Sequence, residues 1–136
     1  MTSQLNVDTI VDKAGSGGTN VKVGNTSTYV SDGGNATQNT VQGIAKSWAA
    51  RLSTADASIN DSLNVSSTTD TDTGRTTVTF TNNFTSINFS VVMGVESNYP
   101  YKGYPASAST MFLNTINSAN SHADGMGALT AHGDLA

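Results

Sequence analysis

Apolar and polar residues alternate along most of this chain, and a period of two is typical of half-buried β-strands. The alternation is clearest over residues 87–95, where every second side chain is large and apolar. Turns rich in Gly, Asn and Asp separate it from other strand-like stretches, at residues 5–11, 63–65, 77–81, 111–113 and 128–135. This spacing predicts a mainly β fold, with an N-terminal extended strand segment at residues 1–35 and a C-terminal antiparallel β-sandwich-like module at residues 58–136.

The period changes between residues 40 and 52. On an α-helix, six apolar side chains of this segment would lie in one stripe along one face. They are Val41, Ile44, Ala45, Trp48, Ala49 and Leu52. We therefore predict a short helix inside a connecting segment at residues 36–57. The stripe is close to a heptad seam, so copies of the chain are expected to pack along it. The candidates for that interface are the larger side chains of the stripe, Val41, Ile44, Trp48 and Leu52.

Composition indicates a thin hydrophobic core. Ser, Thr and Asn account for 51 of the 136 residues, and hydrophobic residues for only 36%. Soluble domains average roughly 45–50% apolar residues. Disordered chains combine low hydrophobicity with a high net charge, whereas the net charge here is only −4. We therefore expect a folded, Thr-rich β protein that completes its core by sharing it between identical copies.

Charge and hydropathy argue against several classes of function. Six Lys and Arg residues cannot form the clustered cations that phosphate binding needs, so we expect no nucleic-acid partner. No stretch approaches the roughly 18 apolar residues of a membrane span, and we expect no membrane insertion. The first ten residues lack the basic and apolar regions of a secretory signal. Without cysteine there is neither a disulfide framework nor a thiolate metal site.

Groups for acid–base catalysis are scarce, with one Glu, two His and nine Asp in the whole chain. Most of the Asp residues lie in turn-like contexts, where the carboxylate bonds its own backbone. A carboxylate pair at Asp70 and Asp72 and metal ligands in two His-x-Asp motifs, at residues 122–124 and 132–134, remain open alternatives. We favour structural roles for all of them. The sequence therefore predicts a protein that is not an enzyme and has no catalytic residue, metal or cofactor.

Tyrosine and proline are concentrated in residues 98–105, which hold three of the four Tyr and both Pro. Tyrosine supplies a large contact area at low entropic cost. We interpret this segment as a recognition loop for a glycan or a protein surface, with Tyr99, Tyr101, Lys102 and Tyr104 as the candidate receptor-binding residues. The alternative is a loop packed against a neighbouring subunit.

Several short motifs follow one another in a set order along the chain. Residues 5–10 read LNVDTI and residues 12–15 read DKAG, and VQGIAKSW follows at residues 41–48. The distal part contains DSLNVSS at residues 61–67, TTVTF at residues 76–80 and a terminal GDLA. In this order the motifs resemble the C-terminal part of phage tail-fibre proteins, especially those of cyanobacterial and marine phages. In such fibres the segment around Trp48 can be extended, whereas its periodicity here favours a helix.

The resemblance implies a homotrimeric virion protein, on the tail, the baseplate or the capsid exterior. Its β module would bind a host surface receptor, often a polysaccharide, and its N-terminal segment would dock onto another virion protein. The resemblance implies no catalytic residue. Two alternatives stay open, a capsid or baseplate decoration protein that stabilises the particle and a carbohydrate-binding module.

Overall fold

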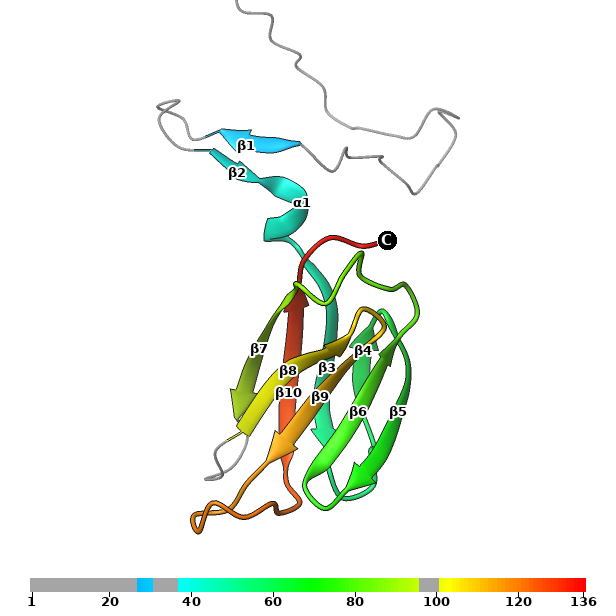
Figure 1. The fold of residues 1–136 in the computed structure, drawn as a ribbon, viewed down its shortest axis with the longest axis vertical. Helices are drawn as coiled ribbons and strands as arrows, with labels where there is room; N and C mark the ends of the chain where they lie inside the picture. The colour runs from blue at the N-terminus through cyan, green and yellow to red at the C-terminus, as the bar shows by residue number, and fades with distance from the viewer. Residues whose placement is uncertain (1–26, 31–36, 96–100) are drawn as a thin grey trace, which may run out of the picture.

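Two antiparallel four-stranded sheets, packed face to face, make up most of the described chain (Figure 1). The computed structural model describes residues 27–30, 37–95 and 101–136. The first sheet, here the β3–β10 sheet, has the order β4 (Asp61–Leu63), β3 (Ala45–Ser53), β10 (Met126–His132) and β7 (Ser90–Val95). The second, here the β6–β9 sheet, has the order β5 (Val65–Asp72), β6 (Arg75–Phe80), β9 (Thr110–Thr115) and β8 (Tyr101–Ser107). The mainly β, sandwich-like architecture predicted from the alternation is confirmed.

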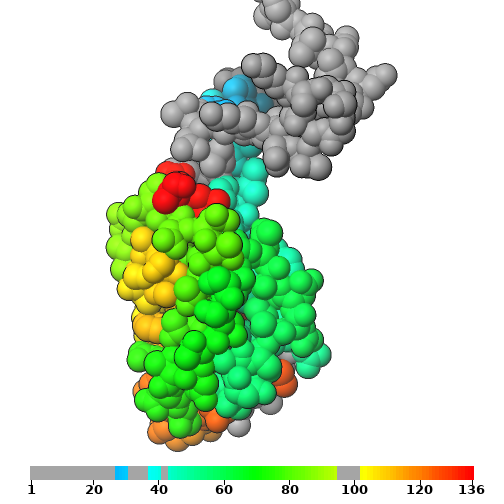
Figure 2. All heavy atoms as spheres, turned by 90° about the vertical axis from the view of Figure 1, so that its right-hand side faces the viewer, coloured from blue at the N-terminus to red at the C-terminus, as the bar shows by residue number. Residues whose placement is uncertain are grey.

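A small N-terminal unit precedes the sandwich. Strands β1 (Thr28–Val30) and β2 (Thr37–Asn39) pair antiparallel, and one helical turn, α1 (Thr40–Gly43), leads into β3. Figures 1 and 2 show this unit beyond the pole of the sandwich at which the C-terminus also lies. Of the predicted N-terminal segment at residues 1–35, the structure describes only Ser27 and strand β1. None of the helices described is long and apolar enough to cross a membrane.

The helix predicted over residues 40–52 is wrong beyond Gly43, because residues 45–53 form strand β3. Ala49 and Leu52 both face the core, although they lie three residues apart. A β-bulge explains this spacing: Leu129 pairs with Ala49 and Gly127 with Leu52, so β3 has one more residue than β10 between these pairs. Arg51 within the bulge has a φ of 52°. Because of the bulge, two core-facing residues of this strand are three positions apart, a spacing that is otherwise typical of a helix.

Strand β3 is also central in its sheet, between β4 and β10. Hydrogen bonding on both sides outweighs helix propensities, which differ by well under about 1 kcal/mol per residue for ordinary side chains. The β module consequently begins at Ala45 rather than at residue 58.

The sandwich closes a hydrophobic core within one chain. Three phenylalanines contact one another at one end, with ring centroids 5.0 Å apart for Phe80 and Phe84, 5.6 Å for Phe80 and Phe89 and 4.2 Å for Phe84 and Phe89. The composition led us to expect a core shared between identical copies, and the structure, which holds one chain, places these buried side chains together within that chain. Its buried members are Leu52, Val78, Phe80, Phe84, Phe89, Met111, Leu113, Leu129 and Ala131.

Candidate functional site

The outward face of the β6–β9 sheet carries part of the Tyr- and Pro-rich segment. A Cβ on Gly103 would lie 2.8 Å from side-chain atoms of Leu129 and Met93, so Gly103 faces the core. Its neighbours Lys102 and Tyr104 therefore face outward, since successive residues of a strand point to opposite faces. Lys102 is exposed and Tyr104 is half-buried.

Tyr104 belongs to a group of four side chains from three adjacent strands, which we call the Tyr104 cluster. Its members are Tyr104 of β8, Phe112 and Asn114 of β9, and Arg75 of β6. Tyr104 lies opposite Phe112 in the sheet, and Arg75 lies opposite Asn114. The rings of Tyr104 and Phe112 meet edge to face with centroids 5.4 Å apart. The Arg75 guanidinium carbon lies 4.8 Å from the centroid of the Phe112 ring, a cation–π arrangement.

Hydrogen bonds lock the polar ends of this cluster. Arg75 Nη2 donates to Tyr104 Oη at 2.9 Å, and Arg75 Nε donates to Asn114 Oδ1 at 3.2 Å. Asn114 Nδ2 donates to the same Tyr104 oxygen at 3.4 Å. The cluster thus holds two aromatic rings, a guanidinium and an amide in fixed positions on one face of the sheet. That combination suits a ligand with both apolar and hydroxyl-bearing faces, such as a sugar.

Threonine hydroxyls lie beside the cluster on the same face, on strands β6 and β5. Thr77 of β6 lies opposite Phe112, and Thr69 of β5 lies opposite Thr77. The hydroxyls of Thr71 and Thr77 are 2.7 Å apart and share a hydrogen bond. This face therefore extends the cluster with small polar groups across the sheet.

The receptor-binding residues predicted from sequence are only partly placed. The segment was interpreted as a loop, but from Tyr101 onward it is edge strand β8, where Pro105 is tolerated because an edge strand has one unpaired side. Tyr99 and the side chain of Tyr101 lie outside the described residues. Sequence reasoning missed Arg75, Phe112 and Asn114, and no local pattern marks them, because strand register alone brings them to Tyr104.

The structure places the predicted interface residues in different environments. Leu52 is fully buried in the core of its own chain, so its prediction as an interface residue is wrong, and the bulge is the reason. Ile44 is 56% exposed. Trp48 is half-buried on the outward face of the β3–β10 sheet, and the side chain of Val41 lies outside the described residues.

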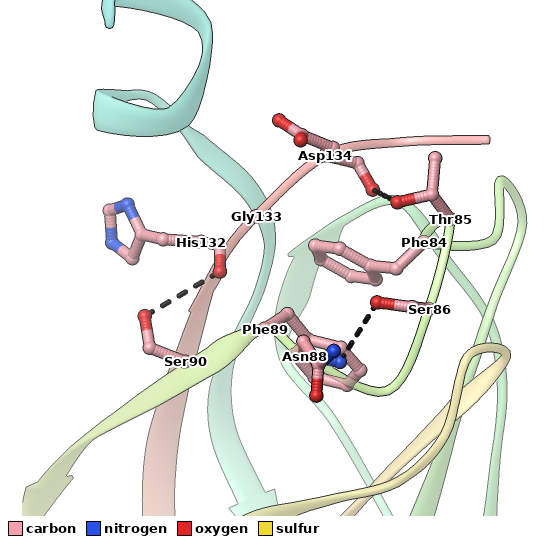
Figure 3. Close-up of a pocket in the computed structure, with 9 residues that line it drawn as sticks. All are labelled: Phe84, Thr85, Ser86, Asn88, Phe89, Ser90, His132, Gly133 and Asp134. Atoms are coloured by element: carbon pink, nitrogen blue, oxygen red, sulfur yellow. Dashed lines mark hydrogen bonds between the residues drawn. The ribbon is translucent and has the colours of Figure 1, made fainter.

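A hollow of about 430 Å³ lies at the pole near α1 and the C-terminus (Figure 3). Its hydroxyls largely bond the backbone, with Thr85 Oγ1 donating to the carbonyl of Asp134 at 3.3 Å and Ser86 Oγ accepting from Asn88 N at 3.1 Å. Nearby, partial burial lowers the pKa of Lys46, and the charge of Asp134 offsets part of that effect. We interpret this region as the contact that holds the C-terminal residues against the sandwich. Its lining residues are Phe84, Thr85, Ser86, Asn88, Phe89, Ser90, His132, Gly133 and Asp134.

Buried threonine hydroxyls hold the loops of the opposite pole together. The hydroxyls of Thr54 and Thr115 are 2.9 Å apart, and Thr115 Oγ1 also donates to the carbonyl of Ala123. Thr54 Oγ1 accepts from Gly125 N at 2.9 Å. Thr115 N also donates to the carbonyl of Gly74 at 2.8 Å. Three connections are therefore joined around these threonines, those after β3, between β5 and β6, and between β9 and β10.

Two of the carboxylates considered for chemistry, Asp72 and Asp124, accept hydrogen bonds from backbone N–H groups at the turn between β5 and β6. Asp124 Oδ1 accepts a hydrogen bond from Gly74 N at 2.7 Å, and Asp72 Oδ1 accepts one from Thr73 N at 2.8 Å. Hydrogen bonds from Ser53 and Ser58 lower the pKa of Asp56, so this exposed carboxylate stays ionised to lower pH. Across residues 27–30, 37–95 and 101–136, no group of three or more His, Asp or Glu side chains is placed to hold a metal ion.

Comparison of the chain with protein-family models, with curated proteins and with solved structures finds no match. The resemblance to phage tail fibres therefore stays a prediction that rests on the order of the short motifs. The geometry of the β-sandwich and of the Tyr104 cluster is independent of that resemblance.

Proposed function

We propose that this chain is a non-enzymatic phage virion protein, a short trimeric tail-fibre-like appendage that binds a host surface glycan. The order of the sequence motifs supports the assignment to a fibre. The N-terminal segment would dock onto another virion protein, on the tail, the baseplate or the capsid exterior. In this proposal the β-sandwich is the part that reaches the receptor.

The observation that carries receptor binding is the Tyr104 cluster. Two aromatic rings, a guanidinium and an amide come together on one open sheet face, and hydrogen bonds hold them in fixed positions. A preorganised site loses little side-chain entropy on binding. Lys102 lies opposite Asn114 and adds a cation beside the cluster, which suits a polysaccharide that carries acidic groups.

Three copies would also strengthen a weak sugar contact. Linked sites that engage a repeating receptor together exceed the affinity of one site by about 10²–10⁴. A glycan with identical repeat units meets this condition. A modest site such as the Tyr104 cluster is then sufficient for firm adsorption.

Replacement of Tyr104 by Ala tests the proposal. We expect the Tyr104→Ala variant to bind cells and extracted surface polysaccharide at least tenfold more weakly, which corresponds to about 1.4 kcal/mol. The measurement is binding of the fluorescently labelled chain to a panel of cyanobacterial strains and to polysaccharide extracted from each. Ile87→Ala is the control, because Ile87 is 51% exposed and lies in the connection before β7, outside the Tyr104 cluster and outside the N-terminal segment.

Equal binding by Tyr104→Ala and the wild-type chain would contradict a receptor site at this cluster. Particles that lose integrity while adsorption is unchanged would instead indicate a decoration protein. A wild-type chain that binds glycan as a monomer would indicate a carbohydrate-binding module.

A further inference from the structure

A row of hydroxyl groups crosses all four strands of the β6–β9 sheet on its outward face. Thr79 of β6 is two residues beyond Thr77 and therefore shares its face. It lies opposite Ser67 of β5 on one side and Thr110 of β9 on the other, and Thr110 lies opposite Ser107 of β8. Ser107 and Thr110 share a hydrogen bond of 2.8 Å. The hydroxyls of Ser67 and Thr79 bond none of the residues that the structure describes, so both can bond a ligand.

Two further rows lie beside the hydroxyl row on this face. The middle row holds the two aromatic rings of the Tyr104 cluster beside two threonines, and the third row holds charged and amide side chains. From β8 to β5 the third row is Lys102, Asn114, Arg75 and Asp72. Strands about 4.8 Å apart, with about 7 Å between alternate residues, make the three rows cover roughly 14 Å in each direction. This face is therefore large enough for several sugars in a chain.

Positive charge is concentrated at one end of the face. Lys102 and Arg75 both lie opposite Asn114, one on each side of it. The Arg75 guanidinium extends toward β8, where its Nη2 bonds Tyr104. Asp72, the carboxylate of the third row, lies on the other side of Arg75, on edge strand β5. In a chain whose net charge is −4, two cations thus lie close together on the β8 side of this row.

The two cations keep donors for an anionic group. A guanidinium has five N–H donors, and Arg75 uses one at Nε and one at Nη2 in its bonds to Asn114 and Tyr104. Lys102 is exposed beside them. Hydrogen bonds from cations to carboxylate or sulfate oxygens are roughly twice as strong as neutral ones. An acidic group of a sugar therefore fits over Asn114, between Lys102 and Arg75.

We propose that the ligand of this face is a stretch of anionic polysaccharide several sugars long, bound along the central strands β6 and β9 with an acidic group between Lys102 and Arg75. This inference rests on the proposed function and adds the charge, the length and the direction of the glycan. Strands β6 and β9 run side by side through the middle of the sheet (Figure 1). Along them the glycan meets first the cations, then the Tyr104 ring, and last the hydroxyls of Thr79 and Thr110.

The length of the glycan is tested with fragments of natural polysaccharide. Surface polysaccharide from a strain that the wild-type chain binds is partially hydrolysed, and its fragments are sorted by the number of sugars. We expect calorimetry to show affinity that rises at least about tenfold from single sugars to fragments that span roughly 14 Å, since each added sugar gains hydrogen bonds. Longer fragments should bind each copy no more tightly.

Lys102→Gln tests the anionic group. We expect about tenfold weaker binding of the spanning fragments, because a charge-assisted hydrogen bond is lost. Lys46→Gln is the matched control, since it removes the same charge from β3 in the other sheet. Reduction of carboxyl groups to alcohols in one sample and removal of sulfate esters in another identify the acidic group. The treatment that removes it should make the wild-type chain and Lys102→Gln bind equally.

Thr79→Val tests the far end of the path, because it removes a hydroxyl and keeps the shape of the side chain. We expect about threefold weaker binding of spanning fragments and unchanged binding of single sugars. Thr130→Val is the matched control, since Thr130 of β10 is half-buried in the other sheet. Urea unfolding followed by Trp48 fluorescence confirms that each variant is folded.

Affinity that is complete with a single sugar, or equal binding by Lys102→Gln and the wild-type chain, would overturn this inference and leave glycan binding at the Tyr104 cluster standing. A wild-type chain that binds no surface polysaccharide would overturn the proposed receptor and this inference together. The two failures are therefore distinguishable.

Discussion

Replacement of Gly74 by Ala is expected to lower the free energy of unfolding by about 2–5 kcal/mol, from backbone strain together with overpacking. Gly74 has a φ of 68° at the turn between β5 and β6. A Cβ there would lie 2.6 Å from the carbonyl oxygen of Thr115 and 2.7 Å from the backbone nitrogen of Ala123. Both neighbours are main-chain atoms, which cannot rotate away as a side chain can.

The surrounding hydrogen bonds make relaxation at Gly74 costly. Its carbonyl accepts from Thr115 N at 2.8 Å, and its own N–H donates to Asp124. Any shift of the turn would break these bonds and disturb the threonine hydroxyls that join the three connections at this pole. The loss is measured by urea unfolding followed by Trp48 fluorescence.

Gly94→Ala is the matched control for this prediction. A Cβ on Gly94 meets only Ala128 Cβ, at 3.6 Å, which is ordinary van der Waals contact. Ala in a strand interior is favoured over Gly by about 0.5–1 kcal/mol, so this variant should be as stable as the wild-type chain or slightly more stable. Equal stability of Gly74→Ala and Gly94→Ala would show that the turn is not constrained as described.

The second large effect is expected for Leu52→Ala. Leu52 is fully buried among the core residues, and truncation of a buried Leu leaves a cavity that costs about 2–5 kcal/mol. Because the cavity lies inside one chain, the loss should be the same at every protein concentration. Urea unfolding at two concentrations, tenfold or more apart, measures it.

This experiment distinguishes two placements of Leu52. In the structure it lies in the core of one chain, whereas the helix predicted from the sequence would place it at an interface between copies. If Leu52 lay at an interface between copies, its replacement would weaken association, and the loss would change with concentration. Ile87→Ala is the control, since an exposed side chain of similar size should change stability by no more than about 0.5 kcal/mol. A loss that differs between the two concentrations would contradict the placement of Leu52 in the core.

Local sequence patterns identified some residues of the Tyr104 cluster and missed others. Tyr104 and Lys102 stand out in the sequence because tyrosines and prolines gather around them. Arg75 and Asn114 lie 39 residues apart in the chain and bond to each other. The pairing of β6 with β9 brings them together, and a register shift of one residue between these strands would put the two side chains on opposite faces of the sheet. No pattern near either residue indicates that register.

The sequence by itself determined the fold class, because alternation of apolar and polar residues is a local property that strands on a half-buried sheet require. It also marked the turn before β6, where Gly74 lies, since Asp and Gly favour turns through their own backbone preferences. Tertiary structure alone decided the state of residues 45–53, where pairing on both sides and one bulge outweighed a helical spacing. It also decided that the core closes within one chain, because burial depends on how two sheets face each other and not on the number of apolar residues.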